Sequence, residues 1–215
     1  MLAKGSSNDK ISIILLAAGR SERFSKGNKL LYKVKGEPLI RRIVKTALDS
    51  DADEVVVVTG YQSDELKCAV KELIGGKLKV VHNKNYEQGM SSSVKAGVKE
   101  VLNRSSAIMI HPADVSFISK RIIDRLIEEY KKKRPKIAVV SYGGRAGHPI
   151  IFDRSLFNEI LGITEQEMGL KSVVNNHRNE ILYVNVDERE VLIDIDTLED
   201  VECYLASKKK VNENI

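Results

Sequence analysis

The sequence predicts an α/β fold: one three-layer domain whose mainly parallel sheet is covered by helices on both faces. Two observations predict this fold. Short runs rich in valine and isoleucine are apolar at odd and even positions alike, which is typical of strands buried on both faces. Amphipathic helical patterns separate these runs through the first two thirds of the chain. The length of 215 residues suits one such domain with a full core.

The expected elements follow from these two patterns. The apolar runs predict strands at 11–17, 54–59, 79–82, 107–110, 136–141, 149–152, 181–185 and 191–195. The amphipathic patterns predict helices at 38–50, 63–74, 91–102, 119–132, 154–161, 170–177 and 197–207. Strand and helix alternate as far as the fifth strand, so we expect right-handed crossovers between parallel strands there.

The alternation stops after Ser141. The stretch 143–149, Gly-Gly-Arg-Ala-Gly-His-Pro, predicts a loop, and Pro149 restricts the next residues to a strand start or an edge strand. We therefore expect the later strands and short helices to form an insertion over the sheet. Residues 1–10 predict a disordered leader, 11–207 the domain, and 208–215 a flexible tail.

Composition excludes several classes of function. No window approaches the ~18 apolar residues of a membrane span, and the polar N-terminus lacks a signal peptide, so we expect a cytoplasmic protein with no membrane partner. The net charge of +5 suits an anionic ligand, but 5% aromatic residues and no tryptophan argue against nucleic acid. Cys68 and Cys203 lie far apart in helical patterns, so we expect two buried thiols rather than a disulfide.

The loop after the first strand indicates a phosphate-bearing ligand. The strand ends at Ala17, and the small residues Ala18 and Gly19 would let backbone N–H groups approach phosphate oxygens. The loop then carries four cations: Arg20, Arg23, Lys26 and Lys29. The segment matches neither the dinucleotide glycine motif nor the P-loop. An ordinary turn with a solvated basic face is the alternative interpretation.

The loop after the third strand and the end of the fourth strand carry the next candidates. Gly89 permits a tight turn, and the serines that follow it open a helix, so this helix start is a candidate contact for a base or sugar. An ordinary helix cap is the alternative. Asp114 follows the run 107–110, where a carboxylate beside a phosphate loop is suited to Mg²⁺. His111 is interpreted as structural.

Two aspartates near the C-terminus form the last candidate site. On a strand Asp194 and Asp196 would point to the same face, and two neighbouring negative charges attract a cation. Thr197 and Asp200 form a capping box for the final helix, which explains both residues structurally.

Taken in order, these segments resemble the MobA-like nucleotidyltransferase family, and within it the molybdenum cofactor cytidylyltransferases. The matching segments are Leu-Ala-Ala-Gly-Arg-Ser-Glu-Arg-Phe at 16–24 with Lys-Leu-Leu at 29–31, Gly-Glu-Pro-Leu at 36–39, Gly-Met-Ser-Ser-Ser at 89–93, Asp114, Gly-His-Pro at 147–149, and Asp-Ile-Asp-Thr at 194–197 with Glu-Asp at 199–200. The resemblance covers nearly the whole chain. It implies a Rossmann-like sheet of the nucleotide-diphospho-sugar transferase type.

The resemblance also implies roles for individual residues. Catalytic roles fall to Arg23, Lys29 and Asp114. Nucleotide contacts fall to Leu16, Ala17, Ala18, Gly19, Arg20, Ser21, Thr59, Gly89, Ser91 and Ser92. Acceptor contacts fall to Gly147, His148, Pro149, Glu167 and Lys171. Ligands for the Mg²⁺ cofactor fall to Asp114, Asp194 and Asp196.

Two departures from the family pattern concern the metal and acceptor sides. Ser116 stands where the family usually has proline, and the segment 166–171 keeps charges of the right sign but has lysine in place of a bidentate arginine.

The resemblance implies transfer of a nucleotidyl group from a nucleoside triphosphate to a phosphate-bearing acceptor. Ala18 favours CTP over GTP, because family members that use GTP tend to have glycine there. Molybdopterin is the favoured acceptor, and a molybdoenzyme that receives the product is an implied partner. The alternatives are a sugar phosphate or methylerythritol phosphate as acceptor, GTP as donor, or a nucleotide-binding regulator without catalysis.

Overall fold

The computed structural model describes residues 9–212, without the side chains of 209–212. Its main sheet has seven strands in the order β5-β4-β1-β6-β8-β7-β9. Their bounds are β1 Ile11–Ala17, β4 Glu54–Thr59, β5 Leu78–His82, β6 Ala107–Pro112, β7 Ile137–Tyr142, β8 Arg145–Asp153 and β9 Ile181–Asn185. β8 runs antiparallel to β6 and β7, and the other strand pairs are parallel, which confirms the expected mainly parallel sheet. The short β2 Lys33–Val34 and β3 Glu37–Pro38 form a separate hairpin.

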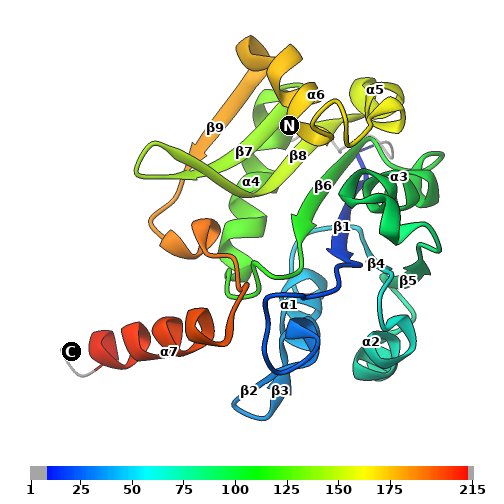
Figure 1. Ribbon diagram of the computed structural model, residues 1–215. Coiled ribbons are helices and arrows are strands. Elements are labelled where there is room, and N and C mark those ends of the chain that lie inside the picture. Colours follow the sequence, from blue (N-terminus) through cyan, green and yellow to red (C-terminus); the bar gives the residue numbers. More distant parts are fainter. Residues whose placement is uncertain (1–8, 213–215) are drawn as a thin grey trace.

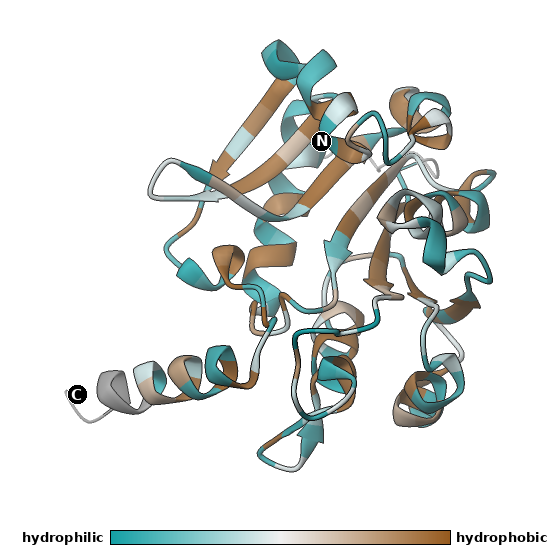
Figure 2. Cartoon of the chain, viewed as in Figure 1, coloured by the Kyte–Doolittle hydropathy of each residue, from teal (hydrophilic) through white to brown (hydrophobic). Residues whose placement is uncertain are grey.

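Helices cover both faces of this sheet, as expected (Figure 1). The helices are α1 Leu39–Leu48, α2 Ser63–Val70, α3 Met90–Val101, α4 Lys120–Lys133, α5 Phe157–Gly162, α6 Leu170–Asn176 and α7 Leu198–Asn212. Apolar residues of α1, α2 and α4 share one core cluster with the sheet, and those of α3, α5 and α6 share the other. The strands are apolar almost throughout, whereas the helices carry polar residues on their outer faces (Figure 2).

The part of the chain after Ser141 differs from expectation. Gly143 and Gly144 both have positive φ, +57° and +77°, as a two-residue hairpin turn requires, so β7 returns directly into β8. The expected loop is therefore mostly strand, and Pro149 lies inside β8 at an interruption of its pairing with β7. β8 and β9 are members of the main sheet, so the expected insertion over the sheet is wrong.

The segment expected as a strand at 191–195 pairs with no strand. Arg189–Leu192 form a 3₁₀ helix (η6), followed by unpaired residues up to α7. Val191 and Ile195 are buried, which accounts for the apolar alternation without strand pairing. α7 continues to Asn212, past the expected start of the tail at 208, and both cysteines are exposed rather than buried. Residues 1–8 and 213–215, which include most of the predicted leader, lie outside the described residues.

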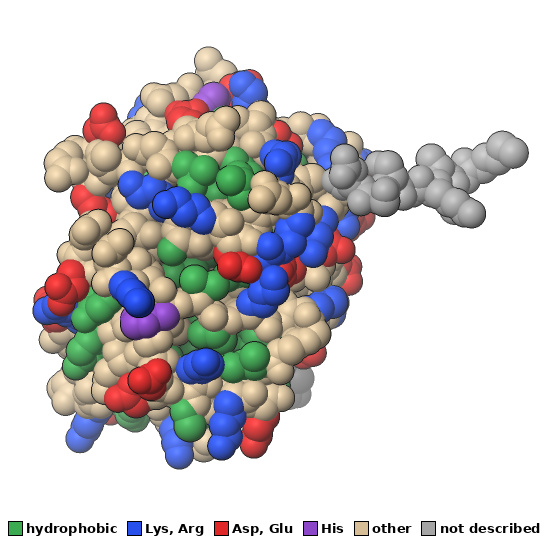
Figure 3. Space-filling model, turned by 90° about the vertical axis from the view of Figure 1, so that its right-hand side faces the viewer, with side chains coloured by type: hydrophobic (Ala, Val, Ile, Leu, Met, Phe, Trp, Pro, Cys, Tyr) green, Lys and Arg blue, Asp and Glu red, His purple; other side chains and the backbone are tan. Residues whose placement is uncertain are grey.

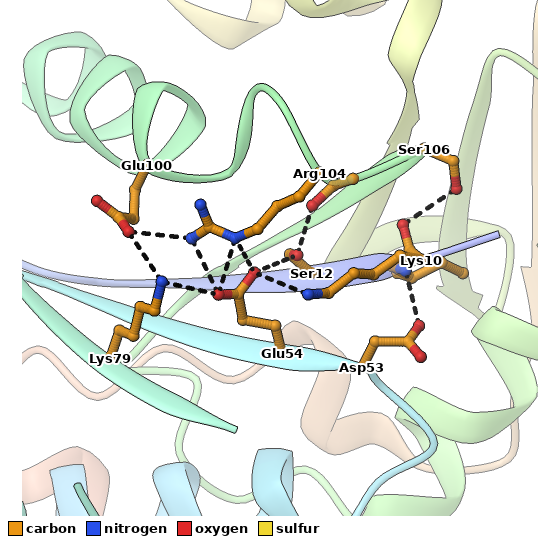
Figure 4. A network of polar contacts seen from close by, with 10 residues as sticks. Lys10, Ser12, Asp53, Glu54, Lys79, Glu100, Arg104 and Ser106 are labelled. Carbon is orange, nitrogen blue, oxygen red and sulfur yellow. Dashed lines mark hydrogen bonds and ion pairs between the residues drawn. The ribbon is translucent and has the colours of Figure 1, made fainter. Parts of the chain in front are cut away.

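A network of charges ties the amino ends of the strands together (Figure 4). The side chain of Glu54 is 6% exposed and accepts hydrogen bonds from Arg104 at 2.9–3.1 Å and from Ser12 at 3.0 Å. Burial alone would raise the pKa of Glu54, but these donors outweigh burial and lower it. This network lies at the opposite edge of the sheet from the candidate site.

The face around β5 and α3 carries interspersed positive and negative side chains rather than a patch of one sign (Figure 3). Mixed charge protects an edge strand such as β5 from pairing with another chain. Between residues 9 and 212, no helix is long and apolar enough to cross a membrane.

Candidate active site

The carboxyl ends of β1, β4 and β6 meet at one edge of the sheet, where ligands bind in open α/β folds. The loop after β1 borders a cleft of about 640 Å³ there, called the main cleft below. Its lining comprises Ala18, Gly19, Arg20, Ser21, Glu22, Arg23, Lys29, Tyr86, Glu87, Gly89 and Asp196. A smaller hollow of about 240 Å³ shares several of these residues and adds Leu16, Met90, Ser93, Pro112 and Asp114. The predicted phosphate loop therefore borders a cleft of the size expected for a small ligand.

Lys29 is the electrostatic centre of this edge. Its Nζ atom lies 2.6 Å from Asp114 Oδ2 and 2.9 Å from Asp196 Oδ1, and its side chain is only 12% exposed. Burial would lower the pKa of Lys29, but the two carboxylates outweigh burial and raise it. Arg23, which is largely exposed, contacts the other oxygen of Asp196 at 2.8 Å. Two of the four loop cations, Arg23 and Lys29, thus contact carboxylates predicted to serve the metal.

Backbone contacts hold the segment 194–196 beside Asp114. The N–H of Ile195 donates to the carbonyl of Asp114 at 3.2 Å. Asp200 then accepts hydrogen bonds from the N–H groups of Asp196 and Thr197, at 2.9 and 2.7 Å. The N–H of Asp200 donates to Thr197 Oγ1, which confirms the expected capping box. These bonds fix the two aspartates at the site although no strand carries them.

Asp194 lies in an environment that suits a bound cation. Among the described residues it has no hydrogen-bond or ion-pair partner, and burial together with the nearby Asp114 raises its pKa. Within residues 9–212, no three acidic, histidine or cysteine side chains form a complete metal cluster. Mg²⁺ is usually held by one or two carboxylates together with substrate phosphates. The carboxylates of Asp114 and Asp194 therefore suit a Mg²⁺ ion that also binds substrate phosphates.

The start of α3 is held by a residue that the sequence analysis did not select. Glu165 Oε1 accepts a hydrogen bond from the N–H of Ser91. Gly89 has a φ of +95°, and a Cβ atom there would lie 2.6 Å from the Glu165 side chain, so only glycine fits. The loop 164–169 thus fixes the start of α3 beside the main cleft. A contact between residues 74 positions apart leaves no signal in a single sequence.

Three lining residues of the main cleft were not predicted as site residues: Glu22, Tyr86 and Glu87. Glu87 forms an ion pair with Arg20, whose guanidinium lies 5.8 Å from the centre of the Tyr86 ring. A Cβ atom at Gly60 would lie 2.4 Å from the Tyr86 Cβ, so this glycine allows the ring to pack against the loop after β1. Tyr86 and Glu87 belong to the loop after β5, in which the sequence analysis selected Gly89 but neither of these two residues.

The buried His111 and the partly buried His148 lie close to each other near the site. The rings of His111 and His148 are 6.4 Å apart, and Nδ1 of each is buried without a partner among the described residues. Burial lowers the pKa of His111 to about 3 and also lowers that of His148, so both rings are neutral at pH 7.

A second hollow of about 360 Å³, called the side groove below, opens beside Asp194. Its lining comprises Val139, Arg145, Ala146, Gly147, His148, Ile150, Val174, Ile181, Tyr183, Val191, Leu192 and Asp194. Gly147 approaches η6 closely, since a Cβ atom there would lie 2.4 Å from the Val191 carbonyl oxygen. Two of the predicted acceptor contacts, Gly147 and His148, therefore line one hollow.

The structure brings together most, but not all, of the predicted residues. Thr59 is fully buried and bonds Ser63 and the Val81 carbonyl, so it supports the loop after β4 rather than facing the cleft. Ser92 bonds backbone carbonyls of its own loop. Glu167 bonds Thr164 in the loop before α6. The other predicted residues that line neither the clefts nor the groove are the buried Ala17, Pro149, Ser91 and the exposed Lys171.

The sequence matches the model of the MobA-like NTP transferase domain over residues 13–181, and the chain belongs to this family. It is a nucleotidyltransferase, with the fold that the resemblance implied.

Among curated relatives, nicotine blue oxidoreductase of Paenarthrobacter nicotinovorans is 25% identical, over 86% of this chain and 92% of the relative. Molybdenum cofactor cytidylyltransferase of Escherichia coli is 24% identical, over 94% of this chain and 98% of the relative.

Among solved structures, a nucleotidyl transfer enzyme of Methanothermobacter superposes with a TM-score of 0.78 at 20% identity, covering 97% of this chain and 100% of the other. A Mycobacterium tuberculosis protein in complex with manganese gives 0.74 at 23% identity, covering 92% and 99%.

Proposed function

We propose that this protein transfers the CMP group of CTP to the phosphate of molybdopterin and releases pyrophosphate. The single observation that carries the proposal is the position of Lys29 between Asp114 and Asp196 at the edge of the main cleft. A cation and two carboxylates at the end of a phosphate loop are the groups that nucleotidyl transfer needs.

In the proposed reaction an oxygen of the acceptor phosphate attacks the α-phosphorus of CTP. The bond from the α-phosphorus to the oxygen bridging it to the β-phosphorus breaks, and the electron pair leaves with pyrophosphate. Because the attacking phosphate is already ionised, no general base is required. Arg20, Arg23 and Lys29 neutralise the triphosphate, exchanging their in-chain carboxylate partners for phosphate oxygens.

Asp114 and Asp194 are the proposed holders of Mg²⁺. When bound, the ion would neutralise charge on the phosphates as it builds up during transfer. The carboxylate oxygens suit a hard cation, and the manganese complex of a structural neighbour supports a divalent metal. Asp196 is not proposed as a metal ligand, because it pairs with Lys29 and Arg23 before the nucleotide binds.

The choice of CTP rests on Ala18 and on one relative. The methyl group of Ala18 narrows the smaller hollow, which Leu16 and Gly89 also line. A pyrimidine base fits more easily than a purine in a narrower hollow. The name of the Escherichia coli relative supports cytidylyl transfer. GTP as donor, and sugar phosphates or methylerythritol phosphate as acceptor, are the alternatives that the experiments distinguish. The cytoplasmic location and a molybdoenzyme partner stay predictions.

The first experiment is a thermal shift of the purified protein with Mg²⁺ and each of CTP, GTP, ATP and UTP. The proposal expects selective stabilisation by CTP. Selective stabilisation by GTP would overturn the choice of base, and no shift with any nucleotide would contradict nucleotidyl transfer.

The second experiment measures pyrophosphate release with CTP and molybdopterin for wild type, Asp114→Ala and Asp187→Ala. Asp187 is 88% exposed and lies outside the site, so it serves as a matched control. We expect Asp114→Ala to lose nearly all turnover while it still folds, at a melting temperature lowered by the lost ion pair with Lys29, and Asp187→Ala to retain turnover. Since one relative is named nicotine blue oxidoreductase, reduction of nicotine blue is measured in parallel. Turnover there without pyrophosphate release would overturn the proposal.

A further inference from the structure

The strand β9 forms the border of the main sheet opposite β5, and no described strand pairs with its outer edge (Figure 1). Edge strands expose a row of unpaired N–H and C=O groups, and proteins protect such edges with charged residues, proline or a bulge. β5 carries Lys79 and His82 within its five residues. β9, with the sequence Ile-Leu-Tyr-Val-Asn, has an unbroken register with β7 and carries none of these protective features. Its outer edge is therefore open to pairing with another strand.

One backbone contact shows which residues of β9 face outward. The N–H of Val186, just past the strand, donates to the carbonyl of Ser141 on β7 at 2.9 Å. Successive residues of a strand direct their backbone groups to alternate edges, so the even-numbered residues of β9 face β7. Ile181, Tyr183 and Asn185 therefore direct both their N–H and C=O groups away from the sheet. Within residues 9–212, none of these three has a backbone partner beyond the pairing of β9 with β7.

This outward row is symmetric about Tyr183. When a second β9 runs antiparallel with the two Tyr183 residues opposite each other, Ile181 of each copy lies opposite Asn185 of the other. Each of these opposed pairs can exchange two N–H···O bonds, because all its members point outward. Directly opposite residues share a face of the sheet, so the two Tyr183 side chains, each 57% exposed and bordering its own side groove, would lie side by side.

The start of β9 carries an unpaired positive charge. Arg178 is exposed, and the described side chain that it contacts is Asn175, which is uncharged. Glu180, at the same end of the strand, is already paired with Lys136 at 2.9 Å. The charge that this end leaves unpaired is therefore positive.

The end of β9 carries the opposite charge. Asp187 and Glu188 follow the strand before η6 begins. Asp187 is 88% exposed, and its nearest described cation, Arg121, lies 3.7 Å away. In an antiparallel pair the start of one strand lies beside the end of the other, so Arg178 of each copy would face the acidic residues of the second copy.

We infer that this edge binds a second copy of the chain, through antiparallel pairing of the two β9 strands across a two-fold axis. The sheet then continues from one copy into the other. The same surface serves both partners in such a contact, so it must be complementary to itself. The outward backbone row and the opposite charges at the two ends of β9 both meet this condition in a single register. The inference does not depend on the proposed nucleotidyl transfer.

The first test is sedimentation velocity of the full chain at increasing concentrations. Tyr183→Lys places two like charges opposite each other on the two-fold axis, which disfavours pairing while leaving the bonds to β7 intact. Tyr61→Lys is the matched control, because Tyr61 is also an exposed tyrosine but lies in the loop after β4. Thermal unfolding of dilute samples verifies that each variant folds.

We expect wild type and Tyr61→Lys to sediment as two chains at the higher concentrations. Tyr183→Lys should raise the dissociation constant of the dimer about tenfold or more. A wild type that stays a single chain at every concentration would overturn the inference. A dimer that Tyr183→Lys leaves unchanged would place the contact on another surface and overturn it as well.

A charge reversal tests the antiparallel register. Arg178→Glu and Asp187→Lys should each weaken the dimer about fivefold or more, and the two together should return it to within about threefold of wild type. A double variant that dimerises no better than either single variant would contradict the register.

Hydrogen exchange followed by NMR tests the backbone pairing itself. The amides of Ile181, Tyr183 and Asn185 should exchange quickly in dilute samples and slowly in concentrated ones. Slow exchange at every concentration in a protein that sediments as a single chain would mean that another segment covers this edge, and would overturn the inference.

Discussion

Replacement of Lys29 by methionine tests the electrostatic centre of the site. The substitution keeps the length of the side chain but leaves Asp114 and Asp196 without the ammonium that lies 2.6 and 2.9 Å from them. Hydrogen bonds to charged groups contribute about 1.5–3 kcal/mol each. Since Asp114 and Asp196 are 25% and 30% exposed, water screens part of this, and we expect the free energy of unfolding to fall by about 2 kcal/mol.

The same substitution should affect catalysis and metal binding in opposite directions. Removing one preorganised charge donor from a phosphate site lowers turnover by about 10²–10³-fold. Without Lys29, the carboxylates of Asp114, Asp194 and Asp196 repel one another, so Mg²⁺ alone should stabilise the variant more than wild type.

Urea unfolding with and without Mg²⁺ measures the stability changes, and pyrophosphate release measures turnover. Lys29→Arg is the control, since it keeps the charge with altered geometry and should fall between the two. A Lys29→Met variant with the stability of wild type and turnover within about twofold of it would refute this reasoning.

Three further predictions concern other contacts of the structure. Glu54→Gln removes the charge that faces Arg104, and we expect urea unfolding to show a loss of about 1–3 kcal/mol at unchanged turnover per folded molecule; no loss would contradict the buried network. Glu165→Ala leaves the N–H of Ser91 without its acceptor, so the KM for the nucleotide should rise about 3–10-fold with little change in kcat. Glu165→Gln keeps an acceptor oxygen and should restore the wild-type KM. An unchanged KM in Glu165→Ala would show that the contact does not position α3. Two glutamates, Glu180 and Glu159, raise the pKa of His177 above its unfolded value of about 6.5. The two contacts therefore stabilise the folded protein fully below pH 6.5, and this stabilisation is lost as the pH rises through the higher pKa of the folded state. The melting temperature should fall more in wild type than in a His177→Gln variant between about pH 6 and 8, and an equal fall in both would contradict this pairing.

The sequence predicted the strands best where an apolar run ends at a polar or small residue. The bounds of β1, β4 and β9 agree with expectation, because runs of β-branched residues end at polar or small residues there. The segment 191–195 has the same apolar alternation, yet it packs its apolar residues without strand pairing. Periodicity reports which side chains are buried and not which backbones pair.

The residues of the candidate site also divide into those that the sequence could predict and those that it could not. Asp114 and Lys29 could be selected because each follows a strand at the edge of the sheet where such ends meet. Glu165 and Tyr86 could not be selected, because their contacts arise only when the fold brings the loop 164–169 to the start of α3 and brings Tyr86 against Gly60. The sequence also could not tell which of Asp194 and Asp196 is the proposed metal ligand, because their positions depend on backbone bonds to Asp114 and Asp200.

The most direct test of nucleotidyl transfer is a stoichiometric one. Wild type and Asp114→Ala are incubated with Mg²⁺, CTP carrying labelled α-phosphorus, and molybdopterin, and pyrophosphate and labelled acceptor are counted together. Transfer predicts that wild type forms both in equal amounts and that Asp114→Ala forms neither. Binding of CTP with no labelled product from molybdopterin or any other phosphorylated acceptor would contradict it.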